Sequence, residues 1–280
     1  MRKLLHNKKL LYLIMGFLIA SVGYLYLEYR YEQKTLDAIT ASIYKEPGLN
    51  RNNNQQVVLA AMHKTHALMT EKETGRMGLE LSGMESSLTS PILRFAVTKD
   101  GACGGNSLVL AQILDGMGFS VRPAQMKVEG QYGGHIVLEV KVDGKWAVLD
   151  PIYNLSFKKP DGSLASFAEV RNNWAYYRAQ TPEDYRPEYR YEDARYTNWN
   201  KVPVLGACAK FVVTLFIGKE RAKYFSVRSL FLNPKKILFY TALFLLGLSA
   251  ISILNRKYFH VTIPSIRLAR KPRPVLMKLT

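Results

Sequence analysis

The sequence predicts an α+β fold in which one domain, built of helices and an antiparallel sheet, lies between two membrane-spanning helices. Two uncharged apolar runs of 18 residues, 10–27 and 237–254, lie near the ends of the 280-residue chain. Between them, apolar residues in 110–117 repeat at the spacing of an amphipathic helix. Alternating segments within 135–149 flank Asp143-Gly144, a dipeptide typical of a two-residue hairpin turn.

Each apolar run would be about 27 Å long as a helix, close to the ~30 Å hydrocarbon core of a bilayer. We interpret 10–27 as an uncleaved anchor. A cleavable signal peptide is the alternative, because basic residues precede the run, but no small-x-small cleavage site stands at its end. For both runs, a buried core helix is the other interpretation that the sequence leaves open.

Basic residues are concentrated at the two ends of the chain. Of 39 lysines and arginines, 4 precede the first run and 7 follow the second, and these tails hold none of the 22 acidic residues. The positive-inside rule therefore predicts that 1–9 and 255–280 are cytoplasmic tails at a cell (inner) membrane and that 28–236 is extracytoplasmic or periplasmic. Lys235 and Lys236, on the outer flank, favour the opposite orientation weakly.

The position of the basic residues also indicates which class of binding partner to expect. The net charge of +17 lies mostly at the flanks of the apolar runs and not on one folded face, so nucleic-acid binding is not expected. The basic C-terminal tail is better suited to anionic lipid headgroups.

The remaining elements follow in order along the chain. Residues 29–45 should extend the first run as a helix as far as Pro47-Gly48, and the domain core is expected at about 57–200. Further elements are a helix at 57–69, a glycine-containing loop at 71–91, a helix from Cys103 to Gly116 or Gly118, strands at 119–128, 135–142 and 145–149, a helix at 163–178, and an irregular tyrosine-rich segment at 181–200. Residues 202–218 are apolar and allow either a core strand pair or a helix in the membrane interface.

Cys103 occupies an unusual position, between glycines and immediately ahead of an amphipathic helix. At a helix N-terminus, free backbone N–H groups and the helix dipole favour the thiolate, which is the nucleophilic form of cysteine. Gly101, Gly104 and Gly105 leave the sulfur unscreened, although glycine in a helix costs about 1 kcal/mol relative to alanine. This loss of local helix propensity is more typical of a functional site than of a scaffold.

Hairpin register then brings a base and a carboxylate together. A turn at Asp143-Gly144 puts Val137 opposite Asp150, and His135 lies two residues earlier on the same face. Such diagonal neighbours are about 7–8 Å apart at the backbone, within side-chain reach. The opposite face is an apolar surface made by Ile136, Leu138, Val140, Val142, Ala147 and Leu149. The pattern predicts a catalytic set of nucleophile, base and orienting carboxylate: Cys103, His135 and Asp150.

These residues carry a family resemblance. The chain resembles the transglutaminase-like superfamily of papain-like thiol enzymes, and specifically a membrane-anchored, bacterial-type member. The resemblance lies in GACGGNS ahead of an apolar helix, followed by GFSVR, GGHIVLEV and KWAVLDPIYN. In that pattern the cysteine opens a helix, the histidine starts a strand, and the aspartate precedes a proline. Cys103, His135 and Asp150 match these positions, and Trp146 matches the tryptophan before the aspartate. The chain departs from the pattern at Val137, where many members carry an aromatic residue.

The resemblance is strongest over about 101–154 and extends to about Trp199, but it covers neither the helices before Gly75 nor the two apolar runs. It implies a papain- or transglutaminase-like core, in which the nucleophile helix packs on an antiparallel sheet. It implies a cysteine protease, amidase or transamidase that acts on an amide bond through a thioester. Gly104, Gly105 and Trp146 would then contact the substrate, expected to be a peptide or protein. No metal or organic cofactor is implied, and the bilayer is the other expected partner.

Two other interpretations remain. The domain is alternatively a catalytically silent accessory subunit that binds a membrane-protein partner in a cell-envelope complex. The two cysteines, Cys103 and Cys208, alternatively form a disulfide or redox pair, although there is no C-x-x-C motif. A metal site at His63 and His66 is not expected, because no other ligand cluster appears. The tyrosines between Tyr176 and Tyr196 are expected to pack or to meet the membrane interface, with cleft lining as the alternative.

Overall fold

The structure is a computed structural model that describes residues 8–70, 103–201 and 203–258, and it has the predicted α+β class. The predicted loop at 71–91 lies outside these described residues. The chain divides into two compact units. One is Gly23–Tyr240, which holds the sheet, and the other is formed by Met1–Val22 and Thr241–Thr280.

The two apolar runs are helical. Helix α2 (Lys8–Tyr44) includes the first run and its predicted extension, and α12 (Pro234–Tyr258) includes the second. Both are long and apolar enough to cross a membrane. None of the apolar window of α2 and only 6% of that of α12 is buried within the protein, which does not fit a buried core helix.

The sheet has five antiparallel strands in the order β4-β3-β2-β1-β5. Its strands are β1 (Val121–Val128), β2 (Gln131–Val142), β3 (Lys145–Asp150), β4 (Leu155–Ser156) and β5 (Ala194–Arg195). The predicted hairpin register is confirmed, since Val142 pairs with Lys145. Asp143 and Gly144 have φ angles of 49° and 83°, and the positive φ at both turn residues is what a type I′ hairpin turn requires.

A bulge interrupts the pairing of β1 with β2 directly before His135. The register runs regularly as far as Met126 opposite His135 and then shifts, so that Lys127 pairs with Tyr132. The two extra residues are Gly133 and Gly134. Gly133 has a φ of 100°, and a Cβ on Gly134 would lie 2.6 Å from the Cβ of Val128. Only glycines fit this bulge, after which the regular pairing of β2 with β1 begins at His135.

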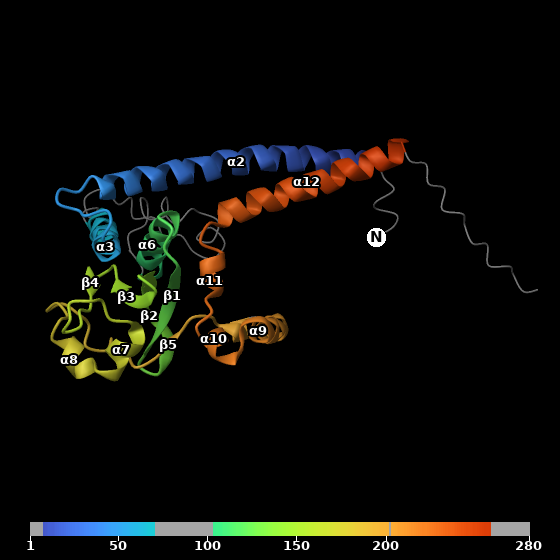
Figure 1. Cartoon of the computed structure of the whole chain (residues 1–280). Helices are drawn as coiled ribbons and strands as arrows, with labels where there is room; N and C mark the ends of the chain where they lie inside the picture. The colour runs from blue at the N-terminus through green and yellow to red at the C-terminus, as the bar shows by residue number, and fades with distance from the viewer. Residues whose placement is uncertain (1–7, 71–102, 202, 259–280) are drawn as a thin grey trace, which may run out of the picture. The chain divides into compact units, whose positions relative to one another are not determined.

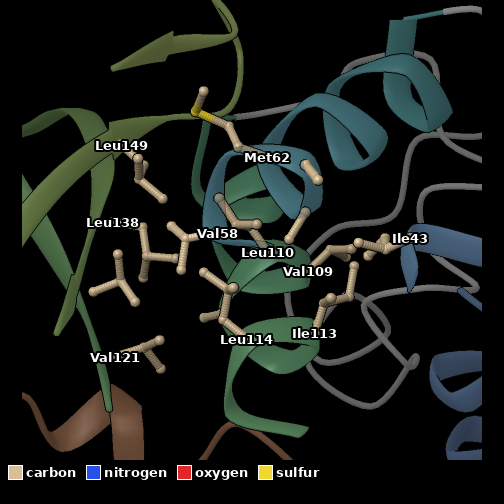
Figure 2. Close-up of a cluster of buried hydrophobic side chains, with 14 of the residues drawn as sticks. Ile43, Val58, Met62, Val109, Leu110, Ile113, Leu114, Val121, Leu138 and Leu149 are labelled. Atoms are coloured by element: carbon tan, nitrogen blue, oxygen red, sulfur yellow. The ribbon is translucent and has the colours of Figure 1, made fainter. Parts of the chain in front are cut away.

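Each face of the sheet is covered by a hydrophobic core. On the first face, α3 (Asn54–Thr70) and α6 (Cys103–Gly116) pack on the sheet (Figure 1), together with Leu36 and Ile43 from α2. Figure 2 shows this core, in which the side chains of α3 and α6 meet Leu138 and Leu149 from the predicted apolar strand face. Helix α6, which begins at Cys103, therefore packs directly against the antiparallel sheet.

The second face is covered by an aromatic core. Helices α7 (Phe167–Asn172) and α8 (Trp174–Arg178) and the segment after them supply most of it. Buried aromatic members of this core are Phe157, Phe167, Tyr177, Tyr185, Tyr189, Tyr191 and Tyr196. The prediction that these tyrosines pack is confirmed, although some of them also contact the candidate site.

Several elements differ from the expected ones. The predicted helix at 163–178 begins only at Phe167, where Ser166 and Glu169 form a capping box, and it breaks at Asn173 into α7 and α8. Strand β1 starts two residues later than expected, and β4 and β5 were not predicted. The proposed strand pair within 202–218 is wrong, because Pro203–Ile217 is the helix α9, and residue 202 lies outside the described residues.

The last described elements connect the sheet domain to α12. The 3-10 helix η2 (Trp199–Lys201) precedes α9, and α10 (Lys219–Lys223) and α11 (Val227–Leu230) follow it. Residues of α11 pack near β1.

Candidate active site

Cys103 is the first residue of α6, and two contacts hold this end of the helix on β2. The Ser107 hydroxyl donates a hydrogen bond to the Ile136 carbonyl oxygen at 2.7 Å. A Cβ on Gly104 would lie 3.1 Å from Cδ1 of Ile136, so a glycine allows the helix to approach the strand closely. The thiol, which is half-buried, therefore lies next to the strand that begins its regular pairing at His135.

His135 and Asp150 form the buried contact that the hairpin register predicts. Nε2 of His135 lies 2.6 Å from Oδ2 of Asp150, and the two side chains are 1% and 0% exposed. The other carboxylate oxygen, Oδ1, accepts a hydrogen bond from the backbone N–H of Ile152 at 3.2 Å. Because an unpaired buried carboxylate would be costly, this arrangement indicates that the carboxylate and the imidazole are stabilised together.

The second ring nitrogen of His135, Nδ1, does not contact Asp150. Nδ1 is buried and has no hydrogen-bond partner of ordinary geometry among the described residues. Cys103 and His135 nevertheless lie close enough for each side chain to shift the pKa of the other. Catalytic hydrogen bonds are often long in structures without substrate and shorten when the substrate binds.

The pKa shifts of the pair favour the ionised form of both groups. Burial raises the pKa of the Cys103 thiol, but His135 and the backbone N–H groups of Ile136 and Gly104 lower it to a net value below the ordinary one. Burial likewise lowers the pKa of His135, but the Asp150 carboxylate and Cys103 raise it to about 9. Both shifts therefore favour a thiolate–imidazolium pair, in which the sulfur is the nucleophile and the ring holds a proton.

A group of tyrosines encloses the imidazole and the carboxylate. The ring of Tyr189 stacks on His135, with the centroids 4.2 Å apart and the planes at 10°. Tyr153 meets the imidazole edge-on at 6.2 Å, and the Tyr185 hydroxyl donates to Oδ2 of Asp150 at 3.5 Å. The sequence indicated packing or a membrane interface for the tyrosines of this segment, with cleft lining as the alternative, and it did not predict their specific contacts with His135 and Asp150.

Two histidines of α3 brace the chain just after Asp150. Nδ1 of His63 lies 2.6 Å from Oδ1 of Asn154, and Nδ1 of His66 lies 3.0 Å from the Pro151 carbonyl oxygen.

The described residues contain no cluster of His, Cys, Asp or Glu side chains that could hold a metal ion. The cysteines Cys103 and Cys208 are both free, so the interpretation as a disulfide is wrong for this structure.

The residues predicted to contact substrate are only partly brought together. Gly104 and Gly105 lie in the first turn of α6 beside Cys103, although Gly105 is buried. Trp146 lies elsewhere, in a separate cleft of about 1,050 Å³ whose lining does not include the predicted catalytic residues. Val137, at the position of the expected cleft aromatic, is fully buried in the aromatic core.

In its own cleft, Trp146 contacts a charged residue. The guanidinium of Arg122 lies 3.9 Å from the centroid of the Trp146 ring and forms an ion pair with the buried Glu139 at 2.8 Å. The Tyr196 hydroxyl donates a hydrogen bond to the same carboxylate. Trp146 is therefore part of a separate aromatic and charged cluster, and a role for it in binding the substrate of Cys103 is not supported by its position.

Comparison with known proteins finds no family model, no curated protein and no solved structure that matches this chain. The interpretation of the site accordingly depends on its own geometry.

Proposed function

We propose that this chain is a membrane-anchored, transglutaminase-like cysteine hydrolase or acyltransferase that acts on an amide bond of a peptide or protein. The observation that carries the proposal is the buried contact of His135 with Asp150 at 2.6 Å beside a thiol of lowered pKa. A histidine that merely fills a core needs neither a buried carboxylate nor a neighbouring thiol. The placement of α6 on the sheet supports a papain-like core.

The three side chains have complementary roles in this chemistry. The Cys103 sulfur attacks the carbonyl carbon of the amide, and the C–N bond breaks as the leaving amine takes a proton from His135. The product of this step is a thioester. His135 then removes a proton from water or from an acceptor amine, which attacks the thioester carbon and releases the thiolate. Water yields a carboxylic acid and an amine yields a new amide, while Asp150 keeps the imidazole oriented throughout.

We also propose the location of this chemistry. The charge asymmetry of the two tails supports an inner-membrane protein with 28–236 outside the cytoplasm and both termini inside it. The two helices that are long enough to span a bilayer support the anchoring.

An acyl donor that forms a thioester with the sulfur tests the proposal. With p-nitrophenyl acetate we expect a burst of p-nitrophenol and one acetyl group on Cys103, found by mass spectrometry of the full chain in detergent. Cys208→Ala should keep the burst, because Cys208 is exposed and distant in sequence from the site. Cys103→Ala should abolish it, and His135→Ala should slow it. Equal acetylation of Cys103 with and without His135 would contradict the proposed roles.

A catalytically silent binding subunit is the second candidate, and the separate cleft of about 1,050 Å³ with Arg122 and Trp146 favours it. This candidate expects Trp146→Ala to weaken binding to a partner. It also expects acetylation of Cys103 to be no faster than that of an ordinary exposed thiol such as Cys208.

A further inference from the structure

Helix α9 exposes an almost wholly apolar surface. Of its 15 residues, PVLGACAKFVVTLFI, only Lys210 is charged. Large apolar side chains that would normally be buried are exposed, Val204 to 77% and Phe216 to 80%. The exposed large apolar residues are Val204, Leu205, Phe211, Val212, Leu215 and Phe216. An exposed apolar patch of this kind marks a site of interaction with a protein or a membrane.

The exposure extends around the helix instead of being confined to one face. Exposed residues occur at consecutive positions and occupy most of the circumference of the helix, and only the side of Gly206, Val213 and Ile217 is half-buried. The main contacts of α9 are with its chain neighbours η2 and α10, and Gly206 packs against the Trp199 carbonyl. A protein partner covers one stripe of a helix and leaves a polar stripe in water, whereas lipid surrounds a helix on all sides. This distribution therefore favours a bilayer over a protein as the occupant.

Charged residues near α9 complement an anionic lipid surface. Between residues 203 and 224 the chain has four basic residues, Lys210, Lys219, Arg221 and Lys223, and one acid, Glu220. Glu220 already pairs with Lys223 at 2.9 Å, which leaves a net positive charge beside the apolar helix. Lys210 is exposed, and its long side chain is able to extend from an apolar environment toward the headgroups.

The length of α9 decides how it can occupy a bilayer. A helix of 15 residues is about 22 Å long, too short for the ~30 Å hydrocarbon core, so it cannot span it unaided. A membrane should also lie close to α9. Helix α12 is long and apolar enough to span a bilayer, and it begins at Pro234, soon after α9 ends at Ile217. The residues between the two helices reach at most about 55 Å when extended, so α9 is tethered within reach of a membrane surface.

We propose that α9 is a third membrane contact of this chain, which inserts into one leaflet of an anionic bilayer without crossing it. The inserted helix would hold the sheet domain against the membrane surface. The inference uses no residue of the candidate active site and so does not depend on the proposed chemistry, but it rests on the proposed anchoring of the chain in a membrane by α2 and α12.

The chain carries its own probe for the test, since Cys208 is an exposed residue of α9. In the full-length Cys103→Ser variant, a polarity-sensitive fluorophore is attached to Cys208, and the protein is reconstituted in vesicles of phosphatidylcholine and phosphatidylglycerol. We expect a blue-shifted emission and quenching by acyl-chain-brominated lipid about threefold stronger than that by an aqueous quencher such as iodide. A matched control carries the fluorophore at an exposed site in the same unit, in the variant Cys103→Ser/Cys208→Ser/Glu183→Cys. In this control, iodide should quench the label more strongly than brominated lipid does.

A second variant separates insertion from misfolding. Phe211→Asp/Phe216→Asp should abolish quenching of the Cys208 label by brominated lipid and leave circular dichroism unchanged. Strong iodide quenching of the label in the unsubstituted helix would overturn the proposal, because α9 would then lie in water. Energy transfer between differently labelled chains that persists as lipid is added in excess would also overturn it, since a second copy would then cover the helix.

Discussion

Removal of the charge of Asp150 should slow the reaction of Cys103 strongly while leaving the fold intact. The substitution Asp150→Asn keeps the size of the side chain and an oxygen that can accept from Nε2 of His135, but it removes the negative charge. In the wild type the pKa of His135 is about 9 against an ordinary value of 6.5, and Asp150 is the largest cause that raises it. Without the carboxylate the largest cause of the increase is lost, and we expect burial to bring the pKa back to about the ordinary value of 6.5.

The size of the effect follows from this shift. At pH 7.5 the imidazolium fraction falls from nearly complete to about one tenth when the pKa drops to 6.5, which sets a lower limit of about tenfold. A loss of about 2.5 pKa units, at 1.36 kcal/mol each, sets an upper range of about 300-fold. We therefore expect alkylation of Cys103 by iodoacetamide to slow between about tenfold and 300-fold.

Alkylation is measured by intact mass in a Cys208→Ser background, in which Cys103 is the sole cysteine of the chain. The matched control is Asp184→Asn, an exposed acid in the tyrosine-rich segment, which should leave the rate unchanged. If Asp150→Asn reacts within twofold of the wild type at pH 7.5, the coupling of carboxylate, imidazole and thiol is refuted.

Three further outcomes follow. Gly134→Ala should lower the free energy of unfolding by about 1–3 kcal/mol, because the new Cβ would lie 2.6 Å from the Cβ of Val128. The control Gly116→Ala should not lower it, because there is open space around Gly116. Thermal unfolding in detergent compares the two variants. In wild type, the raised pKa of His135 makes stability fall as pH rises from 6.5 through about 9, but the lowered pKa of Cys103 offsets this fall. Urea unfolding of Cys103→Ala should therefore show a steeper decline over this pH range than the wild type, because Asp150 still raises the pKa of His135 and no thiolate offsets the fall; a profile no steeper than that of the wild type would contradict the ionised pair. Tyr189→Ala should slow alkylation of Cys103 by roughly three- to tenfold through loss of the ring stacked on the imidazole, and Tyr189→Phe should restore the rate.

The arrangement of the site was largely predictable because it depends on local rules. A two-residue turn fixes hairpin register, and register alone brings His135 beside Asp150. The start of α6 at Cys103 follows from the glycines and the apolar periodicity behind it. That the thiol lies next to the imidazole was inferred from residue roles and family resemblance, since no local rule links α6 to β2.

What the sequence could not predict depends on long-range packing. The two-residue strands β4 and β5 have no periodicity that distinguishes them from loop, and β5 is defined only by its pairing with β1. Trp146 matched a family position, but the chain places its ring on Arg122 in another cleft. Residues 203–217 contact mainly their chain neighbours η2 and α10, and a short apolar run without a clear period could not be assigned to strand or helix from its composition alone.

The contribution of α2 to the first core has a practical consequence for anyone who wishes to study the domain in water. Leu36 and Ile43 of α2, together with Leu232 just ahead of α12, are buried in that core. Gln112 of α6 also donates to Glu32 at 3.0 Å and to the Leu232 carbonyl at 2.6 Å. A soluble fragment that contains only the sheet and its nearest helices would lose these contacts and would expose the apolar surface of the first core to water. An excised version that keeps its shape must retain the chain from about Glu28 to about Lys236.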